Sequence, residues 1–224
     1  MMGSIDGRIV TEGWPMSAEG RRQYELLHDT YDAQGWLCGR ATMEQHFAQH
    51  TRSDEEVAQH YDGAPRDDFV APGAPESFAF AVDSHGRLAW DSNDIDGDHV
   101  VALLATHVSN EYLAHLRDRR VSYLLAGDDE VELSVALKKI GQRFGVRTLM
   151  LEGGGRINGS MLREGLIDEL SVLIAPVVDG RIGTPAVMDV AGDLAPQSLV
   201  LESVEQRPGQ VLWLRYRVQA PVKP

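Results

Sequence analysis

A glycine-rich turn is the part of the sequence with the clearest potential for chemistry. In residues 147–160, RTLMLEGGGRINGS, the apolar run 148–151 is typical of a buried parallel strand, and three consecutive glycines end it. Ile157, Met161 and Leu162 then recur at helical spacing. The segment is therefore predicted to form a strand, a turn and a helix. Its glycines would let the backbone approach a ligand closely, and the N–H groups at the helix start would attract a phosphate.

Glu152 is a candidate ligand contact because of its place in this segment. It stands at the carboxyl end of the predicted strand, where open α/β sheets bind their ligands. The turn itself matches neither the dinucleotide-binding pattern G-x-G-x-x-G nor the P-loop pattern G-x-x-x-x-G-K-[ST]. From these residues alone, a phosphate site and a tight strand-to-helix connection are equally good interpretations.

Composition and charge narrow the classes of function. The chain has 224 residues, with 43% hydrophobic and 25% charged residues, which are ordinary values for a globular protein. Its net charge of -13 argues against nucleic-acid and acidic-membrane partners, because the field would repel phosphate groups. A single cysteine, Cys38, excludes an internal disulfide and a cysteine-based zinc site. No segment resembles a membrane span or a secretion signal, so we expect a cytoplasmic protein.

Hydrophobic periodicity predicts strands that alternate with helices. Ser17 is expected to cap a helix over residues 17–32, Ser109 is expected to cap another, and Gly145 should end a helix that begins at Asp128 or Asp129. Further helices are expected after Gly39 and after the glycine turn. The predicted strands, besides a very short opening one, are residues 36–38, 77–82, 99–105, 121–126, 148–151 and 168–176.

Residues 51–76 interrupt this alternation. The segment is acidic and rich in proline, and it is predicted to be a surface excursion with at most one helical turn, as either a solvated loop or a lid over a site. Just before it, His46 and His50 have the spacing of metal ligands on a helix. No third ligand follows at a suitable distance, so we assign no metal site.

The order of elements predicts the fold class. We expect one α/β domain over residues 1–224, with a mixed, mostly parallel sheet flanked by helices. Residues 198–206 and 210–218 are predicted to form a C-terminal antiparallel hairpin, joined through the turn 207–209. The apolar runs 172–178 and 211–218 make a homodimer plausible, although they are equally compatible with core strands.

Four short motifs occur in one order at domain-like spacing: residues 4–8 (SIDGR), 39–42 (GRAT), 152–155 (EGGG), and 168–170 (DEL) followed by Ala175 and Pro176. With these motifs the chain resembles the RibD C-terminal family, the reductase domain of riboflavin biosynthesis, which has the dihydrofolate reductase fold. The resemblance extends from Ser4 to about residue 187. The zinc motifs of the companion deaminase domain, H-x-E and P-C-x-x-C, are missing from this sequence, so no deaminase activity is expected.

The resemblance implies an NADPH-dependent reductase. Such an enzyme reduces the ribosylamino group of a pyrimidine ribose 5-phosphate to a ribitylamino group. It implies that Ser4, Asp6 and Glu152 bind the substrate and that Arg40 faces the adenosine 2′-phosphate. Hydride transfer does not require a dedicated acid, but if a proton donor is needed, Asp6 or Glu152 is the available carboxyl group. The implied cofactor-binding residues are Gly39, Arg40, Thr42, Gly153, Gly154, Gly155, Arg156 and Ile157.

Two alternatives remain open at this point. The first keeps the fold and cofactor and changes the substrate to a dihydrofolate-like pterin or another small molecule. The second is a homologue that binds a nucleotide and catalyses nothing. Asp6 also has an alternative interpretation as an ordinary turn residue, because Asp-Gly is a common turn sequence.

Overall fold

The computed structural model describes residues 1–48, 50–57, 66–73, 76–190, 192 and 195–219. The chain divides into two compact units, which are described separately here. Unit 1 contains residues 1–32 and 153–224, and unit 2 contains residues 33–152. The continuous segment of unit 2 therefore separates the two segments of unit 1.

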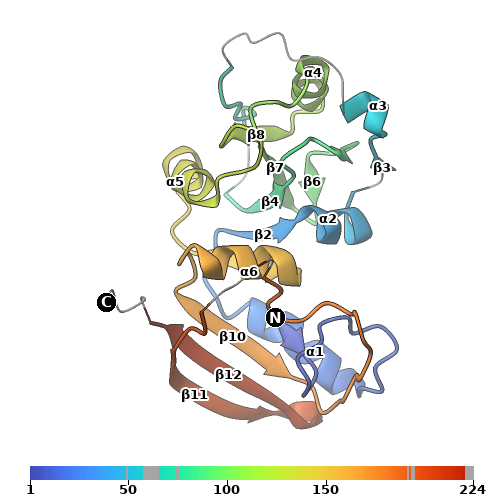
Figure 1. Ribbon diagram of the computed structural model, residues 1–224, viewed down its shortest axis with the longest axis vertical. Helices are drawn as coiled ribbons and strands as arrows, with labels where there is room; N and C mark the ends of the chain where they lie inside the picture. Colours follow the sequence, from blue (N-terminus) through green and yellow to red (C-terminus); the bar gives the residue numbers. More distant parts are fainter. Residues whose placement is uncertain (49, 58–65, 74–75, 191, 193–194, 220–224) are drawn as a thin grey trace. The chain divides into compact units, whose positions relative to one another are not determined.

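Unit 2 is built on a six-stranded sheet (Figure 1). Its centre consists of the parallel strands β2 (Gly35–Gly39), β4 (Phe78–Val82) and β7 (Asp98–Leu104). Strand β9 (Leu149–Gly153) lies beside β2. Beyond β7 lie β8 (Ser122–Leu125), which is parallel to it, and the short antiparallel β6 (Asp94–Ile95). Side chains of the central strands are almost completely buried, as their continuous apolar runs predict.

The helices of unit 2 follow its strands. They are α2 (Arg40–His46), the single turn α3 (Asp54–Val57), α4 (Asn110–Asp118) and α5 (Leu133–Phe144). A small antiparallel pair, β3 (His50–Thr51) and β5 (Leu88–Ala89), accompanies them. The predicted caps are confirmed, because Ser109 accepts a hydrogen bond from the amide of Tyr112 and Gly145 ends α5 in the left-handed conformation.

Two details of the sequence-based description of unit 2 are wrong. Helix α5 begins at Leu133 rather than at Asp128 or Asp129, because residues 126–132 form a turn closed by a hydrogen bond from the amide of Glu132 to the carbonyl of Ala126. The second is the helical histidine pair: His46 ends α2 and His50 lies in β3, so the two residues do not share a helix.

The described part of the excursion 51–76 includes a segment that is anchored to the sheet. Phe69 forms an antiparallel bridge with Tyr123 of β8. The side chain of Asp68 is 4% exposed and pairs with Lys139 of α5 at 2.9 Å, while it accepts a hydrogen bond from the amide of Leu125 at 3.0 Å. A paired and hydrogen-bonded carboxylate of this kind fixes the end of a loop, so this part of the excursion is a fixed element of unit 2.

Unit 1 has a four-stranded sheet in the order β1 (Met2–Gly3), β10 (Glu169–Ile174), β12 (Val211–Val218) and β11 (Leu199–Arg207). Strand β1 is parallel to β10, and the other neighbours are antiparallel. The one-turn helix η1 (Pro208–Gln210) joins β11 to β12, which confirms the predicted hairpin. One irregularity lies in β11, where the register shifts between Leu201 and Ser203.

Two helices belong to unit 1. Helix α1 (Ala18–His28) is capped by Ser17, as predicted, and ends four residues before the expected Asp32. Helix α6 (Gly155–Arg163) follows the glycine turn. The core of the unit gathers apolar residues from α1, the sheet and the N-terminal loop: Met2, Trp14, Leu27, Leu173, Ala175, Val177, Val211 and Trp213. The predicted class, a mixed α/β fold with helices beside the sheet and a terminal hairpin, is confirmed.

Candidate functional site

The first candidate region is the turn that follows β1 in unit 1. Ser4 is completely buried, and its hydroxyl donates to Asp6 Oδ1 at 2.7 Å while it accepts from the amide of Arg8 at 2.9 Å. Gly7 has a φ of 81°, which a turn of this shape requires and other residues rarely adopt. The hydroxyl of Ser4 is thus committed to shaping the turn.

Asp6 connects this turn to a distant loop of the same unit. Its carboxylate accepts hydrogen bonds from the amides of Asp179 and Gly180, both at 2.9 Å, in addition to the bond from Ser4. These donors, with Ser4 contributing most, lower the pKa of Asp6 to about 2. Asp6 is therefore an ionised acceptor at neutral pH, and it has no proton to donate there.

Glu152, in β9, has the opposite electrostatic character. Its side chain is partly buried, and burial raises the pKa of its carboxyl group above the ordinary value. A carboxyl group whose pKa is shifted toward neutrality is suited to general acid or base chemistry. Of the two candidate proton donors, Glu152 is the one whose electrostatics fit that role.

The glycines after Glu152 serve different purposes. Gly153 has a φ of 107°, so the end of β9 requires a glycine. Gly154 precedes α6, and Gly155 is its first residue. A Cβ atom on Gly155 would lie 2.3 Å from the carbonyl oxygen of Ala186, so the lack of a side chain allows another part of the protein to approach. Arg156, the second residue of α6, is exposed, and its neighbour Ile157 is partly buried.

The loop that packs on α6 was missed by the sequence analysis. Asn158 donates to the carbonyl of Val187 at 2.8 Å, and the amide of Asp189 donates to the carbonyl of Gly155 at 2.9 Å. The same loop contacts the N-terminal turn, because the amide of Val187 donates to the carbonyl of Gly7 at 3.0 Å. Segment 184–189 thus joins the SIDG turn to the start of α6, and the only sequence signal for it is the small-residue spacing of Gly155 and Gly159.

The GRAT residues lie in unit 2, at the carboxyl end of β2. Gly39 precedes α2, Arg40 is its first residue and Thr42 is partly buried in its first turn. The guanidinium of Arg40 pairs with the carboxylate of Glu44 one helical turn later. The side chain of Arg40 is 42% exposed and that of Glu44 is 40% exposed. An exposed ion pair of this kind is weak, so Arg40 can exchange Glu44 for an anionic ligand.

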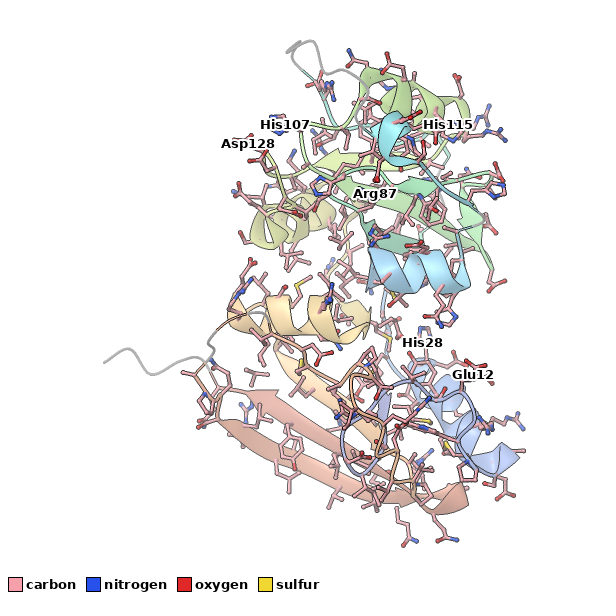
Figure 2. The ribbon with its side chains drawn as sticks, turned by 45° about the vertical axis from the view of Figure 1, so that its right-hand side comes forward. Glu12, His28, Arg87, His107, His115 and Asp128 are labelled. Carbon is pink, nitrogen blue, oxygen red and sulfur yellow. The ribbon has the colours of Figure 1, made fainter. Side chains whose placement is uncertain are left out.

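The loops after the neighbouring strands meet at the same edge of the unit 2 sheet. His107, after β7, pairs with Asp129, after β8, at 2.7 Å. The hydroxyl of Thr106 donates to Asp128 at 3.4 Å. His107 and Asp128 are labelled in Figure 2. His85, after β4, pairs with Glu130 at 3.2 Å. Carboxyl edges of parallel strands are where open α/β sheets bind ligands, and these polar loops border that edge.

Comparison with known proteins identifies the family of this chain. The sequence profile of the RibD C-terminal domain matches residues 1–213. The chain belongs to the RibD C-terminal domain family. All four motifs described above, from the SIDG turn to the DEL and Ala-Pro residues at the two ends of β10, lie inside the matched range.

Two relatives bear the same name. The 2,5-diamino-6-ribosylamino-4(3H)-pyrimidinone 5′-phosphate reductase of Methanothermobacter thermautotrophicus is 39% identical over 192 residues, which cover 84% of this RibD C-terminal domain and 81% of the relative. The protein of that name from Archaeoglobus fulgidus is 26% identical over 132 residues and 59% of each chain.

Solved structures agree in fold. A pyrimidine reductase-like protein from Corynebacterium diphtheriae has a TM-score of 0.70 at 19% identity, with 98% of this chain and 90% of that one covered. Acinetobacter baumannii RibD has a TM-score of 0.68 at 20% identity, with 98% and 57% covered. At these identities the likeness establishes the RibD fold of the chain. None of the helices in the described residues is long and apolar enough to span a membrane.

Proposed function

We propose that this protein is a reductase of riboflavin biosynthesis that converts the ribosylamino group of a pyrimidine ribose 5-phosphate into a ribitylamino group. The observation that carries the proposal is the 39% identity, over most of both chains, with a pyrimidinone 5′-phosphate reductase. The position of the four motifs in the structure agrees with it. The preferred substrate is the diamino pyrimidinone that names this relative, and the deaminated uracil analogue is the comparison compound.

The cofactor we propose is NADPH. When bound, it supplies the hydride for the sugar carbon. Two sets of residues are suited to hold it: in unit 1 Gly153, Gly154, Gly155, Arg156 and Ile157, and in unit 2 Gly39, Arg40 and Thr42. The first set fits a phosphate because it combines a helix start with an exposed arginine.

Arg40 is the residue proposed to distinguish NADPH from NADH. Its partner Glu44 competes with the 2′-phosphate for the guanidinium, because both are anions. Arg40→Ala should therefore raise KM for NADPH with little change for NADH, whereas Glu44→Gln should lower KM for NADPH.

The protein's own chemistry is the delivery of one proton and the orientation of the substrate. We assign the proton to Glu152, because burial raises the pKa of its carboxyl group. Asp6 and Ser4 are assigned to substrate binding through the shape of their turn, with Asp6 as an ionised acceptor held by the amides of Asp179 and Gly180. Water exclusion and alignment contribute the rest of the rate enhancement.

The test is a steady-state assay of NADPH oxidation with three substrates: the diamino pyrimidinone phosphate, its uracil analogue and dihydrofolate. We expect turnover with a pyrimidine phosphate. Glu152→Gln should lower kcat by roughly 10²- to 10⁴-fold, the usual contribution of a general acid, and should remove one limb of the pH profile.

Asp6→Asn provides the matched carboxyl-to-amide control. It should change KM more than kcat and should leave the shape of the pH profile unaltered, since Asp6 does not titrate near neutrality. Turnover of dihydrofolate alone would favour the pterin alternative. Nucleotide binding without oxidation of NADPH by any of the three substrates would favour a homologue without catalytic activity.

A further inference from the structure

Asn158 is a polar side chain buried inside unit 1. It lies in the first turn of α6, where its backbone amide donates to the carbonyl of Gly154 at 3.2 Å, and the residue is only 3% exposed. Its Nδ2 donates to the carbonyl of Val187, while Oδ1 has no hydrogen-bond partner among the residues that the structure describes. A half-satisfied buried amide costs stability compared with an apolar residue of similar size, so packing alone does not explain this side chain.

The hydrogen bond from Asn158 ends on a residue that also contacts the SIDG turn. Val187 accepts from Asn158 Nδ2 through its carbonyl at 2.8 Å, and it donates through its amide to the carbonyl of Gly7 at 3.0 Å. Asn158 also lies beside the glycine turn, because a Cβ atom on Gly153 would lie 3.7 Å from Nδ2. A single residue of segment 184–189 therefore bridges α6 and the SIDG turn.

Segment 184–189 forms further hydrogen bonds on its N-terminal side. The amide of Ile9 donates to the carbonyl of Pro185 at 3.1 Å. Arg8 Nη1 donates to the carbonyl of Thr184 at 2.7 Å. These bonds join the segment to the residues that follow the SIDG turn without involving Asn158. Loss of the Asn158 side chain should therefore leave the segment attached to the SIDG turn and loosen its attachment to α6.

We infer that Asn158 is a positioning residue for the reaction, which sets the distance between the start of α6 and the SIDG turn through Val187. This inference rests on the proposed reductase function, in which the start of α6 holds the cofactor and the SIDG turn binds the substrate. Reacting atoms must lie about 3–3.5 Å apart, and a displacement of about 1 Å can cost roughly 10²-fold in rate. Asn158 thus acts on the rate of hydride transfer without contacting either ligand.

Asn158→Leu is the main test, because leucine has a similar size and cannot donate to Val187. It removes the unpaired Oδ1 together with the donor, so the loss of stability should be small. The single-turnover rate of NADPH oxidation, with enzyme in excess over the pyrimidine phosphate, should fall roughly 10- to 100-fold. KM for each ligand should change by less than about threefold. A merely structural role would produce inactive protein, which lowers the amplitude of the single turnover and leaves its rate unchanged.

Met161→Leu is the matched control. Met161 is also buried in α6, and this nearly volume-conserving change leaves the side chain of Asn158 in place. The single-turnover rate of this variant should equal that of the wild type. Circular dichroism of each variant establishes that it is folded. If Asn158→Leu does not fold, Asn158→Ala replaces it, since alanine also lacks the donor and favours a helix.

Amide hydrogen exchange, measured by NMR, gives a readout that requires no enzymatic activity. The amide of Asp189 donates to the carbonyl of Gly155 at the start of α6 at 2.9 Å. Its exchange should be at least about fivefold faster in Asn158→Leu than in the wild type, because the segment opens more often from the helix. The amide of Ile9, which donates to Pro185, is the internal reference and should exchange at the wild-type rate.

The possible outcomes separate this inference from the proposed function. An active wild type whose single-turnover rate survives Asn158→Leu overturns the inference, and so does a loss of rate that Met161→Leu reproduces. Unchanged exchange at Asp189, or faster exchange at both Asp189 and Ile9, overturns the coupling of α6 to the segment. A wild type that oxidises NADPH with none of the substrates overturns the proposed function, and the coupling is then decided by the exchange rates alone.

Discussion

Asp83 shows how one buried carboxyl group makes stability depend on pH. It follows β4, is 1% exposed, and accepts a hydrogen bond at Oδ2 from the amide of Leu88 at 2.7 Å, while Oδ1 has no hydrogen-bond partner among the residues that the structure describes. Burial raises the pKa of Asp83 in the folded chain. The folded state therefore binds its proton more tightly than the unfolded state does. This stabilisation is complete below the unfolded pKa, and it is lost as pH rises through the folded pKa.

Asp83→Asn should accordingly stabilise the protein at high pH. The amide keeps an acceptor for the amide of Leu88 and removes the buried charge. We expect the variant and the wild type to have similar Tm values below about pH 4, near the model-peptide pKa of aspartate. At pH 8 the variant should be on the order of 2–4 °C more stable, which corresponds to about 1 kcal/mol in a chain of this size. Thermal unfolding across this pH range measures the difference, and a wild-type advantage that grows with pH would contradict it.

Residues whose role depends on their immediate neighbours were predictable from the sequence. Ser17 and Ser109 cap helices, and Gly145 ends one. Each serine accepts a hydrogen bond from an amide three residues later, and the glycine adopts the left-handed conformation, so these roles depend only on residues close in the sequence. The roles of Asp83 and Asp129 could not be predicted in this way, because the residues around them come from other strands and loops. Asp129, for example, pairs with His107 from the loop after a different strand, and it lies in the turn of residues 126–132 that precedes α5.

At the scale of elements, α6 depends on its glycines for packing as well as for its first turn. A Cβ on Gly159 would lie 2.3 Å from the carbonyl oxygen of Asp189, which is backbone and cannot rotate away. Gly159→Ala should therefore separate α6 from segment 184–189 and destabilise the fold by about 1–3 kcal/mol, the usual cost of overpacking. Denaturant unfolding measures the loss.

Gly141→Ala is the control for this substitution. Gly141 lies inside α5. A Cβ atom added there would lie 3.6 Å from the carbonyl oxygen of Val146, which is an ordinary van der Waals contact. Alanine should stabilise this helix by roughly 0.5–1 kcal/mol. Opposite signs for the two variants are expected, and a neutral Gly159→Ala would show that the loop adapts without cost.

Most helices and strands could be predicted from the sequence, whereas the contacts between them could not. The buried strands β4, β7 and β8 are continuous apolar runs, and the hairpin follows from two such runs around Pro208 and Gly209. The sequence motifs also indicated the family. The contacts of segment 184–189 with α6 and the SIDG turn depend on chain folding over long sequence distances, for which a single sequence carries almost no signal.

At the scale of the whole molecule, the net charge of -13 bears on stability. An excess of one sign of charge destabilises the compact state through repulsion within the chain, and this repulsion weakens as salt shortens the Debye length from about 30 Å at 0.01 M to about 8 Å at 0.15 M. The Tm should therefore rise as NaCl rises over this range. Thermal unfolding at both salt concentrations measures the change, and a Tm that falls with salt would show that attractive ion pairs dominate instead.

The register shift in β11 has a consequence for solubility. β11 lies at the edge of its sheet, and strands added there from other copies of the chain would have no natural end. Between Leu201 and Ser203 the ladder slips, so Glu202 lacks an opposite residue on β12, and its carboxylate lies there beside Arg217. A bulge and a charge at an open edge both obstruct the regular stacking of strands. The hairpin can thus expose apolar side chains such as Leu201 and Val204 and still resist growth into fibres.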